Sequence, residues 1–349
     1  MERAEKLIDT LAREHTLTRD EYALLVSLYS PEIAEYAAGK ADSLRREIYG
    51  NKVYIRGLIE IGNACRNNCY YCGIRRSNKA CERYILTREE ILACCEEGYN
   101  LGFRTFVLQS GEGCFTCGEI CSLIKEIKAE YPDCAVTLSL GEFTRDEYAA
   151  MKAAGADRYL LRHETADREH YASLHPDMDF DSRMRCLADL HSLGFQTGCG
   201  FMVGSPGQTV QTIAKDLKFI EEFQPEMCGI GPFIPHADTP FANEKAGSAA
   251  LTVFLLSLIR LIKPDILLPA TTALATVDPL GREKGILAGA NVIMPNLSPV
   301  AVRKKYSLYD GKVCTGEESA QCLKCVETRM KSIGFEISYS RGDYKNGKI

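Results

Sequence analysis

Short apolar runs alternate with longer helix-type segments through most of this 349-residue chain, beginning at residue 53. Eight runs have the length and apolar character of buried strands: 53–61, 105–109, 135–140, 158–161, 196–203, 227–230, 266–269 and 292–294. Helix-type spacing fills intervals between them, over residues 88–101, 118–130, 145–154, 182–193, 210–223 and 249–262. The repeat of roughly 30 residues is that of βαβ units. The alternation therefore predicts an α/β fold built on a parallel sheet.

Eight such units favour a full (β/α)8 TIM barrel over an open, doubly wound sheet. No Gly-x-Gly-x-x-Gly motif follows the first predicted strand, as a dinucleotide-binding sheet would require. Polar residues instead follow nearly every predicted strand, and in a barrel these positions meet at one rim. We therefore expect a polar chamber at the carboxyl ends of the strands.

The remaining parts of the chain are expected to flank this barrel. Residues 1–50 carry helix-type spacing, with a capping box at Thr18 and Glu21, and are predicted to form an N-terminal helical cap. The barrel is predicted over residues 51–300, and residues 301–349 form a short C-terminal extension that closes it. The last 25 residues become more polar and are expected to form a peripheral tail.

Composition indicates the cellular compartment of the chain and excludes some classes of partner. A net charge of −5 does not suggest a nucleic-acid or membrane surface. The N-terminus lacks the apolar core of a signal peptide, and Ser257 and Arg260 interrupt the longest apolar stretch, so a cytoplasmic protein is predicted. Sixteen cysteines in so large a chain, at short metal-type spacings, indicate a reducing compartment and metal clusters rather than disulfides.

Cys65, Cys69 and Cys72 stand at C-x3-C-x2-C spacing directly after the first predicted strand. A [4Fe–4S] cluster has four irons, so three thiolates leave one iron open to bind a small molecule. The alternative is a structural zinc site, which would need a fourth ligand; Cys81 is the nearest plausible one. Tyr71, an aromatic before the last cysteine, can shield the cluster and face the adenine of a bound nucleoside.

This motif after a first barrel strand resembles the radical S-adenosylmethionine (SAM) superfamily. The resemblance implies that SAM binds the open iron through its amino and carboxylate groups. One electron from the reduced cluster then cleaves SAM to a 5′-deoxyadenosyl radical. The protein supplies three thiolates and a dry cavity, and the cofactor supplies the chemistry.

Longer blocks resemble the HydE family of [FeFe]-hydrogenase maturases. They are residues 65–78, 107–112, 136–142, 157–166, 229–236, 269–273 and 290–296, which spread the similarity over about residues 50–325. The family is a single full β/α barrel, in agreement with the strand count. In Cys114, Cys117 and Cys121 the chain departs from the family pattern, and we interpret this set as structural rather than ligating.

The resemblance also implies roles for individual residues. Glu164 matches the carboxylate that holds the ribose or amino end of SAM, and Arg183 matches the arginine that pairs with its carboxylate. A zwitterion needs one anion and one cation, and arginine provides a bidentate clamp. The structural alternatives are a rim ion pair between Glu164 and Arg162 and a solvated helix position for Arg183. Further cofactor-pocket candidates are Ser139, Met202 and Arg162.

Deeper in the barrel, a set of arginine and hydroxyl residues matches family positions that line the substrate cavity: Thr137, Arg158, Thr271, Thr272, Tyr306 and Tyr309. An anionic iron complex would need such donors. The alternative is that the threonines are strand-core residues and the tyrosines belong to an amphipathic helix face.

A separate trio near the C-terminus, Cys314, Cys322 and Cys325, has the spacing of an auxiliary iron–sulfur cluster found in some HydE proteins. The resemblance implies a [2Fe–2S] or [4Fe–4S] cluster there, away from the chamber and dispensable. The alternative is a zinc-binding or accidental trio.

The resulting hypothesis is a radical SAM enzyme that acts in assembly of the hydrogenase H-cluster di-iron subcluster. It would attack a sulfur of an iron-bound cysteine-type substrate. Implied partners are this small iron complex, other hydrogenase maturases and a reductant such as ferredoxin, with the chain itself a monomer. Two alternatives stay open: a related enzyme such as methylornithine synthase or biotin synthase, and a non-enzymatic iron–sulfur electron-transfer protein.

Overall fold

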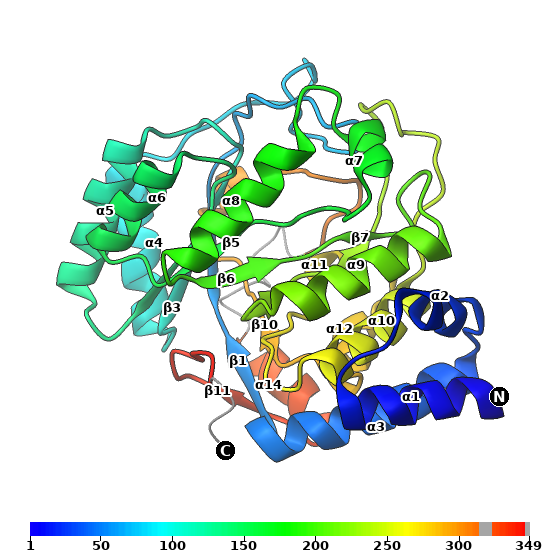
Figure 1. Cartoon of the computed structure of the whole chain (residues 1–349). Coiled ribbons are helices and arrows are strands. Elements are labelled where there is room, and N and C mark those ends of the chain that lie inside the picture. The colour runs from blue at the N-terminus through cyan, green and yellow to red at the C-terminus, as the bar shows by residue number, and fades with distance from the viewer. Residues whose placement is uncertain (314–322, 346–349) are drawn as a thin grey trace.

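The computed structural model describes residues 1–313 and 323–345, and its centre is a ring of parallel strands enclosed by helices (Figure 1). Six strands form one continuous sheet in the order β2-β3-β4-β5-β6-β8. Their bounds are Gly57–Gly62 (β2), Thr105–Ser110 (β3), Ala135–Ser139 (β4), Arg158–Leu160 (β5), Gln196–Cys199 (β6) and Met227–Cys228 (β8). All five pairings within this sheet are parallel.

Two further segments close the sheet on itself. Leu267 pairs with Met227 of β8, and Pro269 pairs with Val292 of β10 (Val292–Ile293). The chain after β10 then returns to β2. There the Leu58 N–H donates to the Pro295 carbonyl (2.9 Å), and the Leu58 carbonyl accepts from the Leu297 N–H (2.7 Å). Eight parallel segments thus complete a barrel, which confirms the predicted fold class.

Three of the predicted strands are interrupted. The run 53–61 divides at Arg56 into β1 (Lys52–Ile55), which pairs with β10 and β11 (Glu336–Ser338), and β2, which pairs with β3. The run 196–203 divides at Gly200 into β6 and β7 (Met202–Val203), and the run 227–230 ends early, with β9 (Gly231–Pro232) following it. A Cβ atom on Gly200 would lie 2.0 Å from the Gly229 carbonyl oxygen. The two backbone segments therefore approach too closely there for regular strand pairing.

The long outer helices agree closely with the sequence periodicity. They are α4 (Arg88–Asn100), α5 (Cys117–Glu130), α6 (Arg145–Ala154), α8 (Phe180–Ser192), α9 (Val210–Phe223) and α10 (Ala249–Ile262). A threonine and a glutamate form a capping box at the start of each of α4, α5 and α6. The short helices α7 (Arg168–Leu174), α11 (Thr272–Val277), α12 (Gly281–Leu287) and α13 (Val300–Arg303) were not predicted, because two turns or fewer leave little periodicity to detect.

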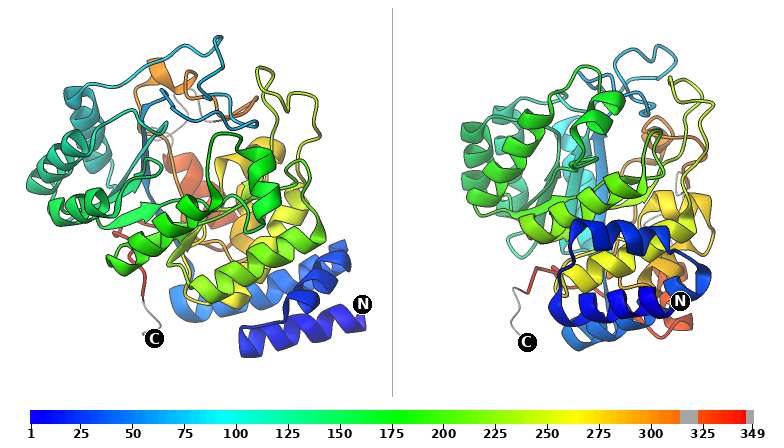
Figure 2. Two further views of the ribbon diagram at one scale, coloured as in Figure 1. Left: turned by 45° about the horizontal axis from the view of Figure 1, so that its top comes forward. Right: turned by 45° about the vertical axis from the view of Figure 1, so that its right-hand side comes forward.

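The N-terminal helices pack on one side of the barrel, against α9 and α10 (Figure 2). These are α1 (Glu2–Glu14), α2 (Arg19–Ser27) and α3 (Pro31–Tyr49), and the capping box predicted at Thr18 and Glu21 is present. Tyr22 of α2 is fully buried and donates its hydroxyl to Glu221 of α9 (2.7 Å). Their apolar residues belong to the same core as the barrel helices, so the cap stabilises α9 and α10 directly.

The last described residues close the barrel at the amino ends of its strands. After α14 (Leu323–Ser332), β11 pairs with β1, and Asp343 then reaches the fully buried Arg158 at the start of β5 (2.6 Å). Arg341 pairs with both Asp157 (2.9 Å) and Asp343 (2.8 Å). The expectation of a peripheral tail is therefore wrong for residues 325–345, because its strand and its charges complete the base of the barrel. Within the described part of the chain, none of the helices has the length and apolarity needed to cross a bilayer.

The base predicts a dependence of stability on pH. Burial opposes the charged form of Asp343, but Arg341 and Arg158 outweigh it and lower its pKa from 3.8 to about 2. A lowered folded-state pKa stabilises the fold above about pH 4 and loses that contribution as pH falls towards 2. We expect Asp343→Asn to destabilise the protein at pH 6 and to unfold with a shallower dependence on pH between 4 and 2.

Thermal unfolding of the cluster-free chain across this pH range measures the effect. Asp146→Asn, at an exposed position on α6, is the matched control and should reproduce the wild-type curve. Identical pH curves for the wild type and Asp343→Asn would refute the assignment.

Candidate active site

The cysteine motif lies in the loop that follows β2, at the rim opposite the C-terminal segment. Three separate parts of the chain hold this loop by its backbone. Arg66 N donates to Glu112 O (2.8 Å), Tyr70 N to Leu174 O (3.0 Å), and Gly73 N to Leu308 O (2.9 Å). The loop is thus fixed by the segment after β3, by the last residue of α7 and by the segment after α13.

Gly73, which follows the last cysteine, is required by close approach. A Cβ atom at this position would lie 2.3 Å from the Ser307 carbonyl oxygen and 2.3 Å from Cδ2 of His236. Backbone atoms cannot yield by that amount, so a larger residue would displace the loop from the segment after α13. His236 itself is mostly buried and packs here as a structural group.

The three cysteines line one pocket together with most of the predicted cofactor residues. The pocket is lined by Cys65, Cys69, Cys72, Tyr71, Gln109, Glu112, Ser139, Arg162, Glu164, His175, Met178, Arg183, Tyr306 and a few apolar and glycine neighbours. In residues 1–313 and 323–345, no three Cys, His, Asp or Glu side chains converge closely enough to hold a single metal ion. Each thiolate of a cluster binds a different iron, and the thiolates therefore lie farther apart than around one ion.

The protein environment favours neutral thiols at this position. Burial raises the pKa of Cys69 to about 12 and that of Cys72 well above its ordinary value, and it also raises the pKa of Cys65. Three thiolates in one pocket need a compensating cation, because like charges repel one another at low dielectric. Bound iron supplies that charge, so assembly of a cluster would release protons.

Tyr71 is fixed by a histidine that the sequence analysis missed. Its hydroxyl lies 3.0 Å from Nε2 of His175, and the two rings meet edge to face with centroids 5.4 Å apart. Nδ1 of His175 lies 3.0 Å from the Tyr171 carbonyl, so Nδ1 donates and Nε2 accepts the tyrosine proton. Burial, helped by Arg183, lowers the pKa of His175 to about 3, which keeps the ring neutral. The histidine lies in the turn between α7 and α8. It does not follow a predicted strand, so its position along the chain gave no indication of a role in the site.

Glu164 adopts a backbone conformation that is unusual for its residue type. Its φ is +64°, and the Thr165 N–H donates to the carbonyl of His163 (2.8 Å), which encloses Glu164 in a three-residue turn. Such a conformation costs roughly 1–3 kcal/mol for a residue with a side chain. In the described chain, its Oε2 is buried without a hydrogen-bond partner, although Arg162 Nη2 lies 3.2 Å away. A buried, unsatisfied carboxylate oxygen in a pocket is suited to accept hydrogen bonds from a ligand.

The rim pairs its charges one to one. Arg183 on α8 contacts Glu142 (Nε to Oε1, 2.7 Å) and donates to the Arg162 carbonyl (2.5 Å). The rim ion pair considered as the alternative for Glu164 is present, and Arg66 pairs in the same way with Glu112 (2.7 Å). These contacts hold both predicted SAM ligands, Glu164 and Arg183, at the pocket.

Other predicted residues lie beside or below the pocket. Met202 on β7 packs in an apolar cluster with Leu174 and Phe233, against which Tyr71 rests, rather than lining the pocket. Tyr306 is buried and lines the pocket. Thr137 on β4 is buried in the barrel, and its hydroxyl has no hydrogen-bond partner within the described chain.

The structure does not bring the remaining cavity candidates to this pocket. Arg158 lies at the base, paired with Asp343, because it begins β5 rather than ending it. Thr271 caps α11, where its hydroxyl accepts from the Leu274 N–H (3.3 Å), and Thr272 opens that helix. Tyr309 is half-buried in the segment after α13. These residues remain predictions for a cavity deeper in the barrel.

A buried ion pair inside the barrel was not expected. Glu60 on β2 is 1% exposed, and its carboxylate accepts hydrogen bonds from Nζ of Lys312 (2.5 Å) and Nδ2 of Asn296 (2.9 Å). Burial raises the pKa of Glu60, and Lys312 and Asn296 oppose this rise. Lys312 also donates to the Tyr306 carbonyl (2.8 Å), so the pair holds Tyr306 at the pocket wall. In the sequence, Glu60 interrupts an apolar strand, and this interruption was the available signal.

The other cysteine sets differ from the first. Cys117 and Cys121 lie at the start of α5 with their sulfurs 3.8 Å apart, and Cys114 donates to the Ala64 carbonyl (2.7 Å). Of the predicted auxiliary trio, Cys314 and Cys322 lie outside the described residues. Cys325 lies exposed on α14.

Comparison with known proteins identifies the family. A model of the Radical SAM superfamily matches residues 59–220. The protein "[FeFe] hydrogenase maturase subunit HydE" of Thermotoga maritima is 45% identical over 330 residues, which cover 94% of each chain. The chain belongs to the HydE family. It is therefore a radical SAM enzyme, as its motifs predicted.

More distant relatives share the barrel. The 3-methylornithine synthase of Methanosarcina acetivorans is 26% identical and aligns over 92% of this chain and 90% of its own. The crystal structure of methylornithine synthase superposes with a TM-score of 0.83 at 25% identity, covering 95% of this chain and 97% of that one. The structure of HydG, a maturase of the [FeFe]-hydrogenase, has a TM-score of 0.79 at 22% identity, covering 97% and 76%, and supports the fold alone.

The radical SAM assignment implies a [4Fe–4S] cluster and SAM, and the site fits both. Three cysteines from one loop line the pocket, and Glu164 across it carries a buried oxygen without a hydrogen-bond partner in the described chain. Thiolates are the ligands of iron–sulfur clusters, and a free carboxylate oxygen suits the hydroxyl or ammonium groups of SAM.

Iron content tests which thiols hold this cluster. We expect the Cys65→Ala/Cys69→Ala/Cys72→Ala variant, after anaerobic reconstitution, to contain about four fewer irons per chain than the wild type. The Cys117→Ala/Cys121→Ala variant is the matched control, because it removes a close pair of thiols from the same rim, and it should retain full iron. Equal loss of iron in both variants would contradict the assignment.

Proposed function

We propose that this enzyme acts in the assembly of the di-iron subcluster of [FeFe]-hydrogenase, on an iron-bound cysteine-type substrate and through its sulfur. The 45% identity to a HydE maturase along nearly the whole chain supports this role. The observation that carries the chemistry is the pocket itself, where three cysteines face a strained glutamate whose buried Oε2 lies near Arg162 but accepts no hydrogen bond within the described chain. When bound, the cluster and SAM supply a 5′-deoxyadenosyl radical.

The residues of the chain divide the work of binding SAM. Cys65, Cys69 and Cys72 would hold three irons. Glu164 would accept hydrogen bonds from the ribose or the ammonium group, and Arg183 would pair with the carboxylate. Tyr71, held by His175, would cover the adenine side. Ser139 and Arg162 complete the wall, and Met202 supports Tyr71 from behind.

The substrate would lie below SAM, inside the barrel. Thr137 and Tyr306 offer hydroxyl groups there, and Lys312 neutralises Glu60 behind Tyr306. Thr271, Thr272 and Tyr309 would extend this wall on the side of α11 and the segment after α13. Arg158 would stabilise the base rather than contact the substrate directly, since Asp343 already pairs with it.

Product formation tests the chemistry. We expect the wild type, reduced with dithionite, to form 5′-deoxyadenosine from SAM, and the Cys65→Ala/Cys69→Ala/Cys72→Ala variant to form none, because the electron reaches SAM through the cluster. The Cys117→Ala/Cys121→Ala variant should match the wild type. Normal product from the first variant would rule out radical SAM chemistry at this pocket.

Rescue of a maturase-deficient host tests the substrate assignment. We expect this chain, produced together with the other hydrogenase maturases and a ferredoxin-type reductant, to restore [FeFe]-hydrogenase activity to a cell that lacks its own HydE. A chain that forms 5′-deoxyadenosine but gives no rescue would indicate a related reaction, such as that of methylornithine synthase, which the 26% identity and shared barrel keep as the second candidate.

An auxiliary cluster is a further part of the proposal. Cys314, Cys322 and Cys325 would bind a [2Fe–2S] or [4Fe–4S] cluster away from the pocket, in a protein that works as a monomer in the reducing cytoplasm. We expect Cys325→Ser to lower the iron content of the reconstituted protein without lowering 5′-deoxyadenosine formation. Unchanged iron would contradict the auxiliary site, and lost product would contradict its dispensability.

A further inference from the structure

The strained turn at Glu164 is surrounded by polar contacts that come from other elements. Gly200, between β6 and β7, uses both of its backbone groups here: its carbonyl accepts from the Glu164 N–H (2.9 Å), and its N–H donates to Nδ1 of His163 (3.2 Å). The Gly200 backbone packs directly against Gly229, whose N–H donates to the Cys199 carbonyl (2.9 Å), so the position of Gly200 is set by the neighbouring strand. The residue before Glu164 and Glu164 itself are therefore tied to one fixed point.

Asp216 on α9 forms the second anchor. Its Oδ1 accepts from the Ala166 N–H (2.5 Å) and lies 3.3 Å from Nε2 of His163. One carboxylate thus contacts the residues on both sides of the Glu164–Thr165 segment. Since Nδ1 of His163 accepts from Gly200, the proton of the neutral ring is on Nε2 and faces Asp216.

The His163–Asp216 pair is poorly explained as a source of stability alone. Both side chains are fully buried, and neither Nε2 of His163 nor Oδ2 of Asp216 has a hydrogen-bond partner within the described chain, so the 3.3 Å contact between Nε2 and Oδ1 is a close polar contact. Burying an incompletely satisfied carboxylate is costly, and an apolar pair of similar volume would fill the space between Phe201 and Phe219 with less cost. Strained conformations persist where the surrounding structure determines them, and they gather at functional sites.

We propose that His163 and Asp216 are positioning residues that hold Glu164 in its left-handed turn, so that the Glu164 carboxylate faces SAM. Neither side chain lines the pocket, and both act through the backbone of residues 163–166. This inference rests on the proposed role of Glu164 in binding SAM.

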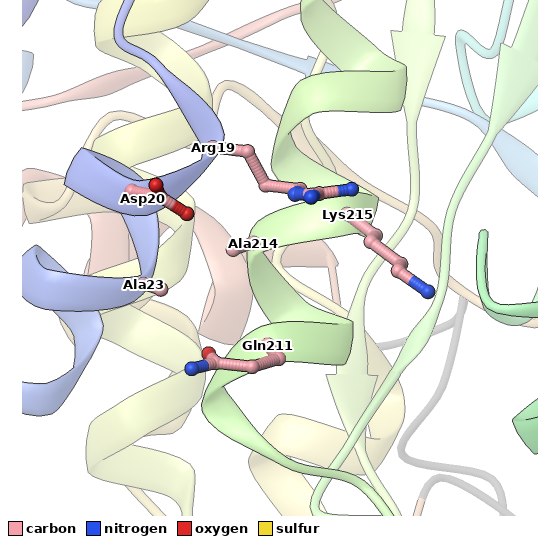
Figure 3. A pocket seen from close by; sticks show the side chains of 6 residues that line it. All are labelled: Arg19, Asp20, Ala23, Gln211, Ala214 and Lys215. Carbon is pink, nitrogen blue, oxygen red and sulfur yellow. The ribbon is translucent and has the colours of Figure 1, made fainter.

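The same helix holds the end of this segment and contacts the N-terminal cap. Lys215, the neighbour of Asp216, pairs with Asp167, the residue that caps α7 (2.5 Å). Figure 3 shows Lys215 and Arg19 beside the hollow where α2 lies against α9. Two neighbouring residues of α9, Lys215 and Asp216, thus contact the segment that carries Glu164.

His163→Phe is the principal test, because it keeps an aromatic ring between Phe201 and Phe219 but removes both ring nitrogens. In the cluster-free chain we expect amide hydrogen exchange of the peptide spanning residues 160–167 to become at least about fivefold faster. In the reconstituted protein without reductant we expect the dissociation constant for SAM, measured by calorimetry, to rise at least about tenfold. In His163→Gln, whose amide can donate to Asp216, both the exchange rate of residues 160–167 and the dissociation constant for SAM should lie close to the wild-type values.

Tyr22→Phe is the matched control. It also removes one buried hydrogen bond to α9, but at Glu221, away from the turn. It should leave exchange at 160–167 and SAM affinity unchanged. Equal effects of Tyr22→Phe and His163→Phe would show general destabilisation and overturn the inference. If His163→Phe does not fold, Asp216→Ala replaces it, since it removes the acceptor of the Ala166 N–H; wild-type SAM affinity in Asp216→Ala would overturn the inference.

Glu164→Gln separates this inference from the function on which it rests. Weakened SAM binding in Glu164→Gln with wild-type binding in His163→Phe would overturn the positioning role alone. Wild-type binding in Glu164→Gln would overturn the proposed role of Glu164, and the positioning role with it.

Discussion

The closure of the barrel at Leu58 is the contact on which the rest of the structure depends. Backbone hydrogen bonds of Leu58 with Pro295 and Leu297 join the first strand of the barrel to the last. Every loop that follows a strand then lies at the same rim. The cysteine loop is held at that rim by three segments that are distant from one another in sequence, after β3, at the end of α7 and after α13. An open sheet would place these segments along an edge, and the loop would lose two of its three supports.

Once the rim is closed, the pocket residues are held by buried polar groups from other parts of the chain. His175 orients Tyr71, Lys312 and Glu60 hold Tyr306, and His163 and Asp216 surround the Glu164 turn. Binding sites work best when the contacting side chains are already held in place, because a ligand then does not bear the cost of ordering them. These particular buried polar groups therefore fix the positions of the residues that line the pocket.

The sequence predicts the regular parts of this fold well, because they repeat. Three long outer helices match to the residue, and the threonine or serine that caps each of them is visible in the sequence. It fails where one long-range contact overrides local pattern. The strand is interrupted at Gly200 because the Gly229 backbone packs too closely against it. Arg158 lies at the base of the barrel, where it pairs with Asp343 from the end of the chain. His175 and the His163–Asp216 pair were invisible for the same reason, since their partners are distant in sequence.

The charge pattern of the rim favours a zwitterion as its ligand. Arg66, Arg162 and Arg183 each have a carboxylate partner, namely Glu112, Glu164 and Glu142, so this part of the rim is neutral by itself. An ion of one sign would leave a partly buried charge without its partner, which is costly. The amino-acid end of SAM carries one ammonium and one carboxylate, and can therefore exchange partners with one arginine and one glutamate at no change in net charge. The pair with the poorest internal geometry, Arg162 with Glu164, is the one that such an exchange would disturb least.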